Sequence, residues 1–406
     1  MTPKSKTGFS VLLLSYVAFV FLGLDQLLGV AWPFIRRDFV LEQDAMGAAL
    51  LSGTLGYMFA SFASGRLMTR LGVGPAMIFS SGVKLLALVA LGAAPGWWVF
   101  VGIGFFSGAG SGVVDAGLNT YIATHYGPRQ LNWLHACFGL GATVAPLIIT
   151  QMFNWGLVWR WSYVVIGLLQ GVMVVAFVAT RSQWKPLWRT EAAVPVPTTP
   201  VRRMSYRETL RLPLVWLGIA LFFVYTGTEG AAGNWSYTLF YESRGVAASV
   251  AGIWVSIYWA ALTVGRVVLG LVIERIGARL TLRLCMIGTI VGALLITQRA
   301  VDWLSFLGLA LVGFALAPIF PTLIAETPGR VGNEHAPNAI GFEVGAAGIG
   351  IALLPGLAGI LARNIGLEVI GPFIVVIAVL ALVLHEMMLL PRWSRLKTAP
   401  GLAQGR

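Results

Sequence analysis

Charged residues are scarce in this 406-residue chain. They make up 11% of the sequence, whereas an ordinary soluble domain contains roughly 25%. So few charges cannot cover the surface of a water-soluble protein of this size. The composition therefore excludes a cytosolic globular enzyme.

The residues that build metal centres and disulfides are also few. The chain has two cysteines, Cys137 and Cys285, both within apolar stretches, and four histidines without metal-binding spacing. Two cysteines are too few for a disulfide framework or a Cys-based metal site. No nucleophile arrangement, phosphate loop or cofactor fingerprint is visible. We expect no metal, no cofactor and no enzymatic activity.

Long hydrophobic runs are what the chain has in abundance. Hydrophobic residues make up 57% of it, and the mean hydropathy is +0.82. A helix needs about 20 apolar residues to cross a bilayer. The sequence predicts an all-α membrane protein with twelve transmembrane helices, at residues 9–31, 45–66, 75–94, 98–122, 132–154, 161–180, 213–237, 248–271, 281–297, 303–326, 338–361 and 367–390.

The distribution of Lys and Arg predicts the orientation. If the N-terminus is cytoplasmic, twenty of the 28 Lys and Arg residues fall on the cytoplasmic side, six on the other side, and Lys84 and Arg266 within helices. Cytoplasmic loops of membrane proteins carry this excess of positive charge. We therefore expect both termini in the cytoplasm and a multi-pass location in a cell membrane, in bacteria the inner membrane.

Residues 181–212 interrupt the hydrophobic pattern in the middle of the chain. This segment carries seven Lys and Arg residues together with Pro186, Pro195, Pro197 and Pro200, a composition that cannot bury a core. It predicts a cytoplasmic linker between an N-terminal six-helix bundle, residues 1–180, and a C-terminal bundle with a short tail, residues 213–406. A nucleic-acid-binding arm is the competing interpretation, but the orientation rule explains the charge without a partner, so we expect no nucleic acid.

An internal repeat supports this division. The sequence after the second helix contains Gly65, Arg66 and Arg70, and the sequence 205 residues later contains Gly270, Glu274, Arg275, Gly277 and Arg279. Repetition at half the chain length indicates two related bundles. The second copy resembles the loop of the major facilitator superfamily, in which the acid and Arg latch the cytoplasmic helix ends together. The first copy has Thr69 where the acid belongs.

Charged side chains within membrane helices are costly, so each needs an explanation. Asp115 has Ser111 one helical turn before it and Asn119 one turn after it, so all three lie on one face. Gly104, Gly108 and Gly112 recur at the same period and allow a neighbouring helix to approach closely. This polar stripe favours a cavity wall that binds hydroxyl groups and exchanges protons, with a structural hydrogen bond between helices as the alternative.

Asp25 and Lys84 present a second choice. Asp25 can form a structural salt bridge with Lys84, or it can titrate against a cavity, and we favour titration. Lys84 can pair with Asp25 or Asp115, or extend its ammonium group to the interface. Both possibilities remain open for Lys84.

Other polar residues in the predicted helices are candidate substrate ligands. His135 can be a hydrogen-bonded interhelical residue or a cavity ligand. Tyr225, Glu229 and Asn234 lie in a glycine-rich helix, where Trp235 either stacks on a sugar ring or belongs to the interfacial aromatic belt. For Glu343, a cavity role and a structural pair with Arg266 are both open.

The helices that hold these residues resemble the fucose/proton symporter family of the major facilitator superfamily over most of the chain. The resemblance is carried by Asp25, by Asp115 with Asn119, by Phe138 and Gly139, by Tyr225 with Trp235, Ser236 and Tyr237, by Gly265 and Arg266, and by Pro321 and Thr322. It implies two pseudo-symmetric six-helix bundles and sugar uptake by alternating access. Protonation and sugar binding carry over to Asp25 and Asp115, and sugar contact to Asn119. The sequence departs from the family at His135 and Glu229.

The resulting hypothesis is a monomeric secondary transporter that imports a neutral monosaccharide, a hexose or deoxyhexose, together with protons. A proton-coupled exporter of a drug or amphiphile and a facilitative sugar uniporter are alternatives on the same fold. A receptor or membrane enzyme is a further alternative, but the sequence shows neither an output domain nor a catalytic motif.

Overall fold

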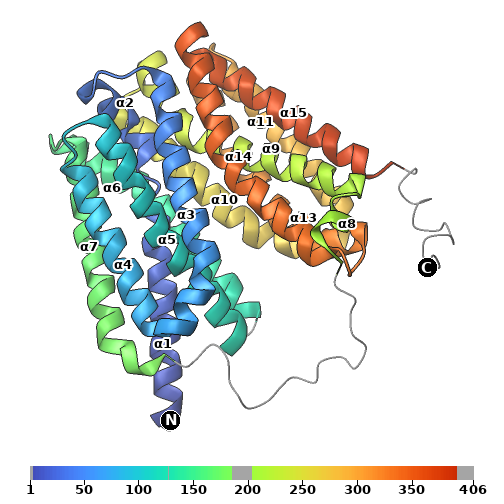
Figure 1. Ribbon diagram of the computed structural model, residues 1–406. Coiled ribbons are helices and arrows are strands. Elements are labelled where there is room, and N and C mark those ends of the chain that lie inside the picture. Colours follow the sequence, from blue (N-terminus) through green and yellow to red (C-terminus); the bar gives the residue numbers. More distant parts are fainter. Residues whose placement is uncertain (1–2, 127, 185–203, 391–406) are drawn as a thin grey trace.

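The computed structural model describes residues 3–126, 128–184 and 204–390, and these residues form long helices packed side by side (Figure 1). In the first half of the chain the elements are α1 (Pro3–Gly23), α2 (Leu28–Asp38), η1 (Gln43–Ala45), α3 (Met46–Leu71), α4 (Val73–Gly92), α5 (Trp97–His125), α6 (Pro128–Asn154), α7 (Trp159–Thr180) and η2 (Arg181–Gln183). In the second half they are α8 (Tyr206–Thr209), α9 (Pro213–Thr238), η3 (Leu239–Ser243), α10 (Ala248–Ile276), α11 (Ala278–Thr297), α12 (Asp302–Leu316), α13 (Ile319–Val331), α14 (Ala336–Ile365), η4 (Leu367–Val369) and α15 (Ile370–Met388).

The predicted number of membrane spans is confirmed. Eleven helical segments are long and apolar enough to cross a bilayer, and the bent pair α1 and α2 makes a twelfth. The first bundle was expected to end at residue 180 and the second to begin at residue 213. In the structure α7 ends at Thr180 and α9 begins at Pro213. Most of the predicted linker, residues 185–203, and the C-terminal tail lie outside the described residues.

The prediction of one continuous helix over residues 9–31 is wrong. The helix breaks after Gly23, and α1 and α2 meet at an angle of 41°. At the break the backbone makes short-range bonds, from the Asp25 amide to the Leu22 carbonyl at 3.3 Å and from the Leu27 amide to the Asp25 carbonyl at 2.7 Å. A polar break of this kind is tolerated at membrane depth only where protein or a water-filled cavity satisfies the backbone.

The predicted helix 303–326 is also divided. It consists of α12 and α13, separated by Ala317 and Pro318. Proline has no amide hydrogen to donate to the preceding turn, which explains the interruption. The carbonyl of Leu316, the last residue of α12, instead accepts a hydrogen bond from the Tyr225 hydroxyl at 3.2 Å.

The two halves repeat each other in detail. Gly72 ends α3 with φ 86° and ψ 161°, and Gly277 ends α10 with φ 84° and ψ 152°. This left-handed conformation favours glycine, and the two positions have the 205-residue separation of the sequence repeat. Each half is also tied by an ion pair near the end of its first span, Asp38 with Arg160 in one half and Arg244 with Glu368 in the other.

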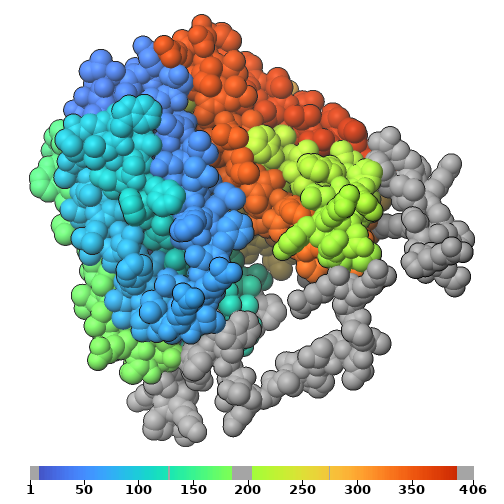
Figure 2. Space-filling view, in the orientation of Figure 1, coloured from blue at the N-terminus to red at the C-terminus, as the bar shows by residue number. Residues whose placement is uncertain are grey.

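The halves meet closely at one end of the molecule and separate toward the other (Figure 1). We call the end with residues 36–46 and 238–248 the closed end, and the end with the N-terminus the open end. At the closed end α3 approaches α14, where a Cβ on Gly47 would lie 2.9 Å from the Gly356 Cα. Figure 2 shows a hollow between the halves that widens toward the open end.

Candidate functional site

The break between α1 and α2 positions Asp25 against two other helices. Its Oδ2 lies 2.6 Å from the Nζ of Lys84 on α4 and accepts a hydrogen bond of 2.9 Å from the Ser111 hydroxyl on α5. Lys84 is buried, whereas Asp25 is partly exposed. Of the arrangements that the sequence left open, the structure therefore shows the pairing of Lys84 with Asp25. The other oxygen, Oδ1, accepts no hydrogen bond from the described residues.

Asp115 lies on α5 one turn beyond Ser111 and has different partners. The Tyr57 hydroxyl on α3 donates a hydrogen bond to its Oδ2, and the Asn119 amide donates to its Oδ1 at 3.1 Å. No basic side chain of the described residues forms an ion pair with this carboxylate. Tyr57 was not predicted as a site residue. The sequence separation between Tyr57 and Asp115 does not indicate that they touch, because the contact depends on how α3 packs on α5.

Glycines make this packing possible. A Cβ on Gly108 would lie 1.9 Å from the Gly53 carbonyl oxygen, and one on Gly112 would lie 2.3 Å from the Tyr57 carbonyl oxygen. The predicted close approach of a neighbouring helix is therefore confirmed at Gly108 and Gly112. At Gly104 a Cβ would meet nothing within 4 Å, so the absence of a side chain there is not needed for the contact.

A second polar group lies in the C-terminal half. The Tyr225 hydroxyl on α9 lies 2.8 Å from a carboxylate oxygen of Glu229 one turn later, and the Tyr258 hydroxyl on α10 donates to the Glu229 carbonyl at 2.9 Å. Both tyrosines are buried, and Glu229 is partly exposed. The carboxylate of Glu229 is thus held by a hydroxyl, and no basic side chain in the described part of the chain forms an ion pair with it.

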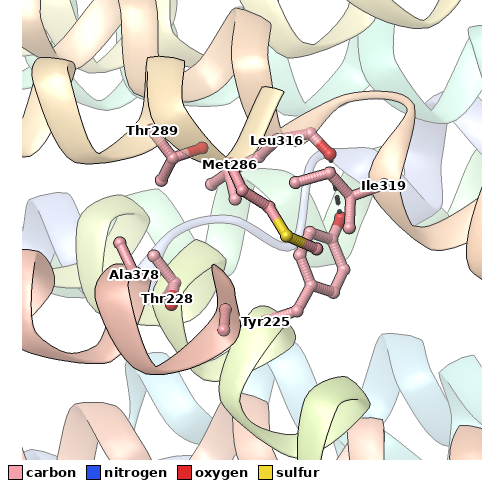
Figure 3. Close-up of a pocket in the computed structure, with 8 residues that line it drawn as sticks. Tyr225, Thr228, Met286, Thr289, Leu316, Ile319 and Ala378 are labelled. Carbon is pink, nitrogen blue, oxygen red and sulfur yellow. Dashed lines mark hydrogen bonds between the residues drawn. The ribbon is translucent and has the colours of Figure 1, made fainter. Parts of the chain in front are cut away.

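Tyr225 also borders a small pocket inside the C-terminal half (Figure 3). The other residues of its lining share an apolar or hydroxyl character: Thr228, Met286, Thr289, Leu316, Ile319, Ala378 and Ala381. These residues come from α9, α11, α12, α13 and α15. None of these elements carries Asp25 or Asp115, so the pocket lies apart from those two carboxylates.

His135 lies on α6 with its side chain exposed and its ring 5.6 Å from that of Phe19 in an edge-to-face contact. Arg266 on α10, in the other half, lies near enough to interact electrostatically with His135, Tyr225 and Tyr258. The candidate residues of the two halves thus face each other between α6 and α10.

Asn234 and Trp235 have structural contacts in this conformation. The Asn234 amide donates to the Gly230 carbonyl at 2.9 Å, and its backbone lies against Gly29 of α2. Trp235 is fully buried, and its indole N–H donates to the Pro355 carbonyl at 2.8 Å. The structure does not bring these two side chains to the carboxylates of the first half.

Glu343 lies apart from these groups as well. Its carboxylate is buried on α14 and accepts a hydrogen bond of 2.8 Å from the Thr327 hydroxyl on α13. Arg330, one turn after Thr327 on α13, lies near enough to interact electrostatically with the Glu343 carboxylate. The pair of Glu343 with Arg266, which the sequence left open, is therefore not formed.

Polar contacts between the halves gather at the closed end and were not predicted. Glu242 lies 3.1 Å from both Arg36 and Arg37 and accepts a hydrogen bond from Gln43 at 3.2 Å. Arg363 pairs with Asp44 at 3.1 Å. In the sequence these residues lie in short loops where charge is ordinary, so only the tertiary structure shows that they join the two halves.

The predicted latch residues lie at the open end, far along their helices from these contacts. Gly65, Arg66, Arg70, Gly270, Arg275, Gly277 and Arg279 are exposed. No ion pair involves Arg66, Arg70, Arg275 or Arg279 within the described part of the chain. The side chain of Glu274 lies outside what the structure describes.

Comparison with known proteins gives a family match over nearly the whole chain. Residues 14–246 and 217–404 match the family model described as Major Facilitator Superfamily. "Bypass of stop codon protein 6" of Saccharomyces cerevisiae is 25% identical over 388 residues, which cover 87% of this chain and 77% of that protein. The glucose/mannose transporter GlcP of Bacillus subtilis is 22% identical over 360 residues, which cover 86% of each.

Solved structures match the fold at low sequence identity. The nucleoside transporter NupG has a TM-score of 0.78 at 12% identity, covering 94% of this chain and 99% of that one. The fucose:proton symporter FucP of E. coli has a TM-score of 0.61 at 16% identity, covering 93% and 98%. These similarities extend over both halves of the molecule.

Proposed function

The chain belongs to the Major Facilitator Superfamily, and from this premise we propose that it imports a neutral monosaccharide, a hexose or deoxyhexose, together with protons. The observation that carries the proposal is the α5 stripe, where Ser111 bonds Asp25 and Asp115 bonds Asn119 and Tyr57. Two carboxylates within one polar surface supply both hydroxyl recognition and a group that exchanges protons. The similarity to a glucose/mannose transporter and to a fucose:proton symporter supports the sugar class.

Asp115 and Asp25 have different tasks in this proposal. Asp115 has no cationic partner among the described residues, so its carboxylate can accept a proton without leaving a buried positive charge unpaired. Asp25 is paired with Lys84, so its protonation releases the ammonium group. Both steps change the charge of the polar surface. A proton can favour one conformation only if it binds more tightly to that conformation than to the other.

The conformation described above is one end of the transport cycle. The halves are joined by Glu242, Arg36 and Arg37 at the closed end and are apart at the other end. With both termini cytoplasmic, as the Lys and Arg distribution predicts, this form opens to the cytoplasm and releases sugar there. The latch around Arg66 and Arg275 would form when that side closes.

The test is uptake of radiolabelled monosaccharides into proteoliposomes, with and without an inward proton gradient. We expect gradient-driven accumulation by the wild type and its loss in Asp25→Asn and in Asp115→Asn. The control is Asp302→Asn, an exposed acid at the start of α12, which should leave accumulation unchanged.

The other outcomes separate the alternatives. Sugar uptake without any gradient effect would replace the symporter with a facilitative uniporter. An absence of flux for every neutral sugar in the panel would refute sugar import, and proton-driven efflux of a drug or amphiphile from the same vesicles would then establish an exporter. Flux of any solute in these vesicles would exclude a receptor or a membrane enzyme.

A further inference from the structure

The register between α6 and α10 places Arg266 on the surface between the two halves. A Cβ on Gly139 would lie 2.2 Å from the Thr263 hydroxyl oxygen, and one on Gly252 would lie 1.9 Å from the Thr150 hydroxyl oxygen. The two helices are therefore antiparallel where they touch. An advance of eleven residues on α6, from 139 to 150, matches a step back of eleven residues on α10, from 263 to 252. Extending this register from Gly139 back to His135 reaches residue 267, beside Arg266.

Arg266 has no anionic partner in this conformation. No carboxylate oxygen of the residues that the structure describes lies within 4.0 Å of its guanidinium group. The nearby acid, Glu229, is held by the Tyr225 hydroxyl at 2.8 Å. By contrast, Lys84 has Asp25, and Arg244 has Glu368 at 2.8 Å.

An unpaired guanidinium at membrane depth is costly, and in membrane proteins such groups face the bundle interior or a water-filled cavity and mark the pathway of a solute. Arg266 is partly exposed, and the side chain of His135 opposite it is exposed. Both side chains therefore remain accessible in this conformation.

The planar guanidinium forms two parallel hydrogen bonds with a carboxylate, a geometry that a sugar hydroxyl cannot match. The acids of the first half, Asp25 in the break after α1 and Asp115 on α5, are hydrogen-bonded to hydroxyl and amide groups. A ligand that reaches from one half to the other would meet carboxylates and amides on one side. On the other side it would meet Glu229, which is held by Tyr225, and Arg266, which pairs with no carboxylate of the described residues.

We propose that Arg266 binds the carboxylate of an acidic monosaccharide, so that the carrier takes uronates in preference to the matching neutral hexoses. This inference rests on the proposed function in taking the substrate to be a monosaccharide. It goes beyond that function in giving one half of the site a preference for negative charge.

The experiment uses the full chain and pairs of sugars that differ only at carbon 6: glucose with glucuronate, and galactose with galacturonate. Binding of each to the purified protein is measured by calorimetry, and uptake into proteoliposomes is measured in parallel. For the wild type we expect the uronate of at least one pair to bind about 10-fold more tightly than its parent hexose.

The variants separate recognition from folding. Arg266→Gln should remove the preference, so that uronate and hexose bind within about two-fold of each other, whereas Arg266→Lys should keep part of it through charge alone. Arg299→Gln, at an exposed arginine paired with Glu368 on the surface, is the matched control and should keep the full preference.

The outcomes are distinct from those that test neutral-sugar import. Uronate binding that needs Arg266, in a protein that accumulates no neutral sugar, would support this inference and refute neutral-sugar import. Neutral-sugar accumulation with no uronate preference, or an unchanged preference in Arg266→Gln, would overturn this inference and leave neutral-sugar import standing. A protein that binds neither sugar of either pair would overturn this inference, while neutral-sugar import would still be decided by accumulation of the wider monosaccharide panel.

Discussion

The Oδ2 atom of Asp25 lies 2.6 Å from the Nζ atom of Lys84, and the Lys84 side chain is 1% exposed. The pair joins the break between α1 and α2 to α4, so it fixes the position of a helix end that has lost its regular hydrogen bonds. Removing one member of such a pair leaves a buried charge, which costs more than the pair itself contributes.

We therefore predict that Asp25→Asn lowers the free energy of unfolding by about 3 kcal/mol. The double variant Asp25→Asn with Lys84→Met should regain most of this loss, because it leaves no buried charge. Thermal unfolding of the purified proteins in detergent measures both. If the double variant were less stable than Asp25→Asn, the ion pair would not be the source of the loss.

Asp115 offers a test that does not depend on stability. Asp115→Asn should abolish proton-driven accumulation while sugar exchange between the two sides continues, because exchange needs binding and conformational change but no net proton movement. Tyr57→Phe removes the hydroxyl that donates to Asp115 and keeps the carboxyl group, so accumulation should continue at a reduced rate. Counterflow and gradient-driven uptake in the same vesicles distinguish these results, and loss of exchange in Asp115→Asn would contradict the assignment.

The hydrophobic runs were sufficient to predict the twelve spans and their order, because exposing polar groups to lipid is costly. The stripe of Ser111, Asp115 and Asn119 was also predictable, because helical periodicity places residues four apart on one face. All three side chains do lie together on α5.

The features that the sequence could not predict depend on contacts between distant segments. Nothing near Tyr57 indicates that it reaches Asp115, and Glu242 meets Arg36 only because the halves close at that end. The break at Asp25 was missed because the surrounding residues are apolar, and hydropathy averages over a short polar interruption. Lys84 shows the same limit, since its pairing depends on where that break directs Asp25.

The glycines of α5 predict a contrast between neighbouring substitutions. Gly108→Ala places a methyl group against the Gly53 carbonyl, where the ideal Cβ would be only 1.9 Å away, so α3 must move away from α5. Overpacking of this kind costs about 1 to 3 kcal/mol. Gly104→Ala, one turn earlier, meets nothing within 4 Å and should leave stability unchanged or slightly raised. Thermal unfolding of both variants checks the contrast, and equal losses would show that α3 and α5 pack less closely than described.

The Glu242 contacts at the closed end predict a shift in conformation. Glu242→Gln removes the charge that faces Arg36 and Arg37, and hydrogen bonds to charged groups contribute about 2 kcal/mol. A loss of that size changes the ratio of two conformations roughly 30-fold. The variant should therefore populate the form that opens at this end, because the substitution removes no contact from that form.

Spin labels at Glu42 and Asn364, exposed residues beside the Arg363 and Asp44 pair, report the separation of the two halves at the closed end. They are attached to a protein in which Cys137 and Cys285 are replaced by serine. The matched control is Glu386→Gln, which breaks the pair with Arg283 inside the C-terminal half and should leave the label distances unchanged. Equal distances in Glu242→Gln and the wild type would mean that apolar packing between α3 and α14, and not the ion pairs, keeps this end closed.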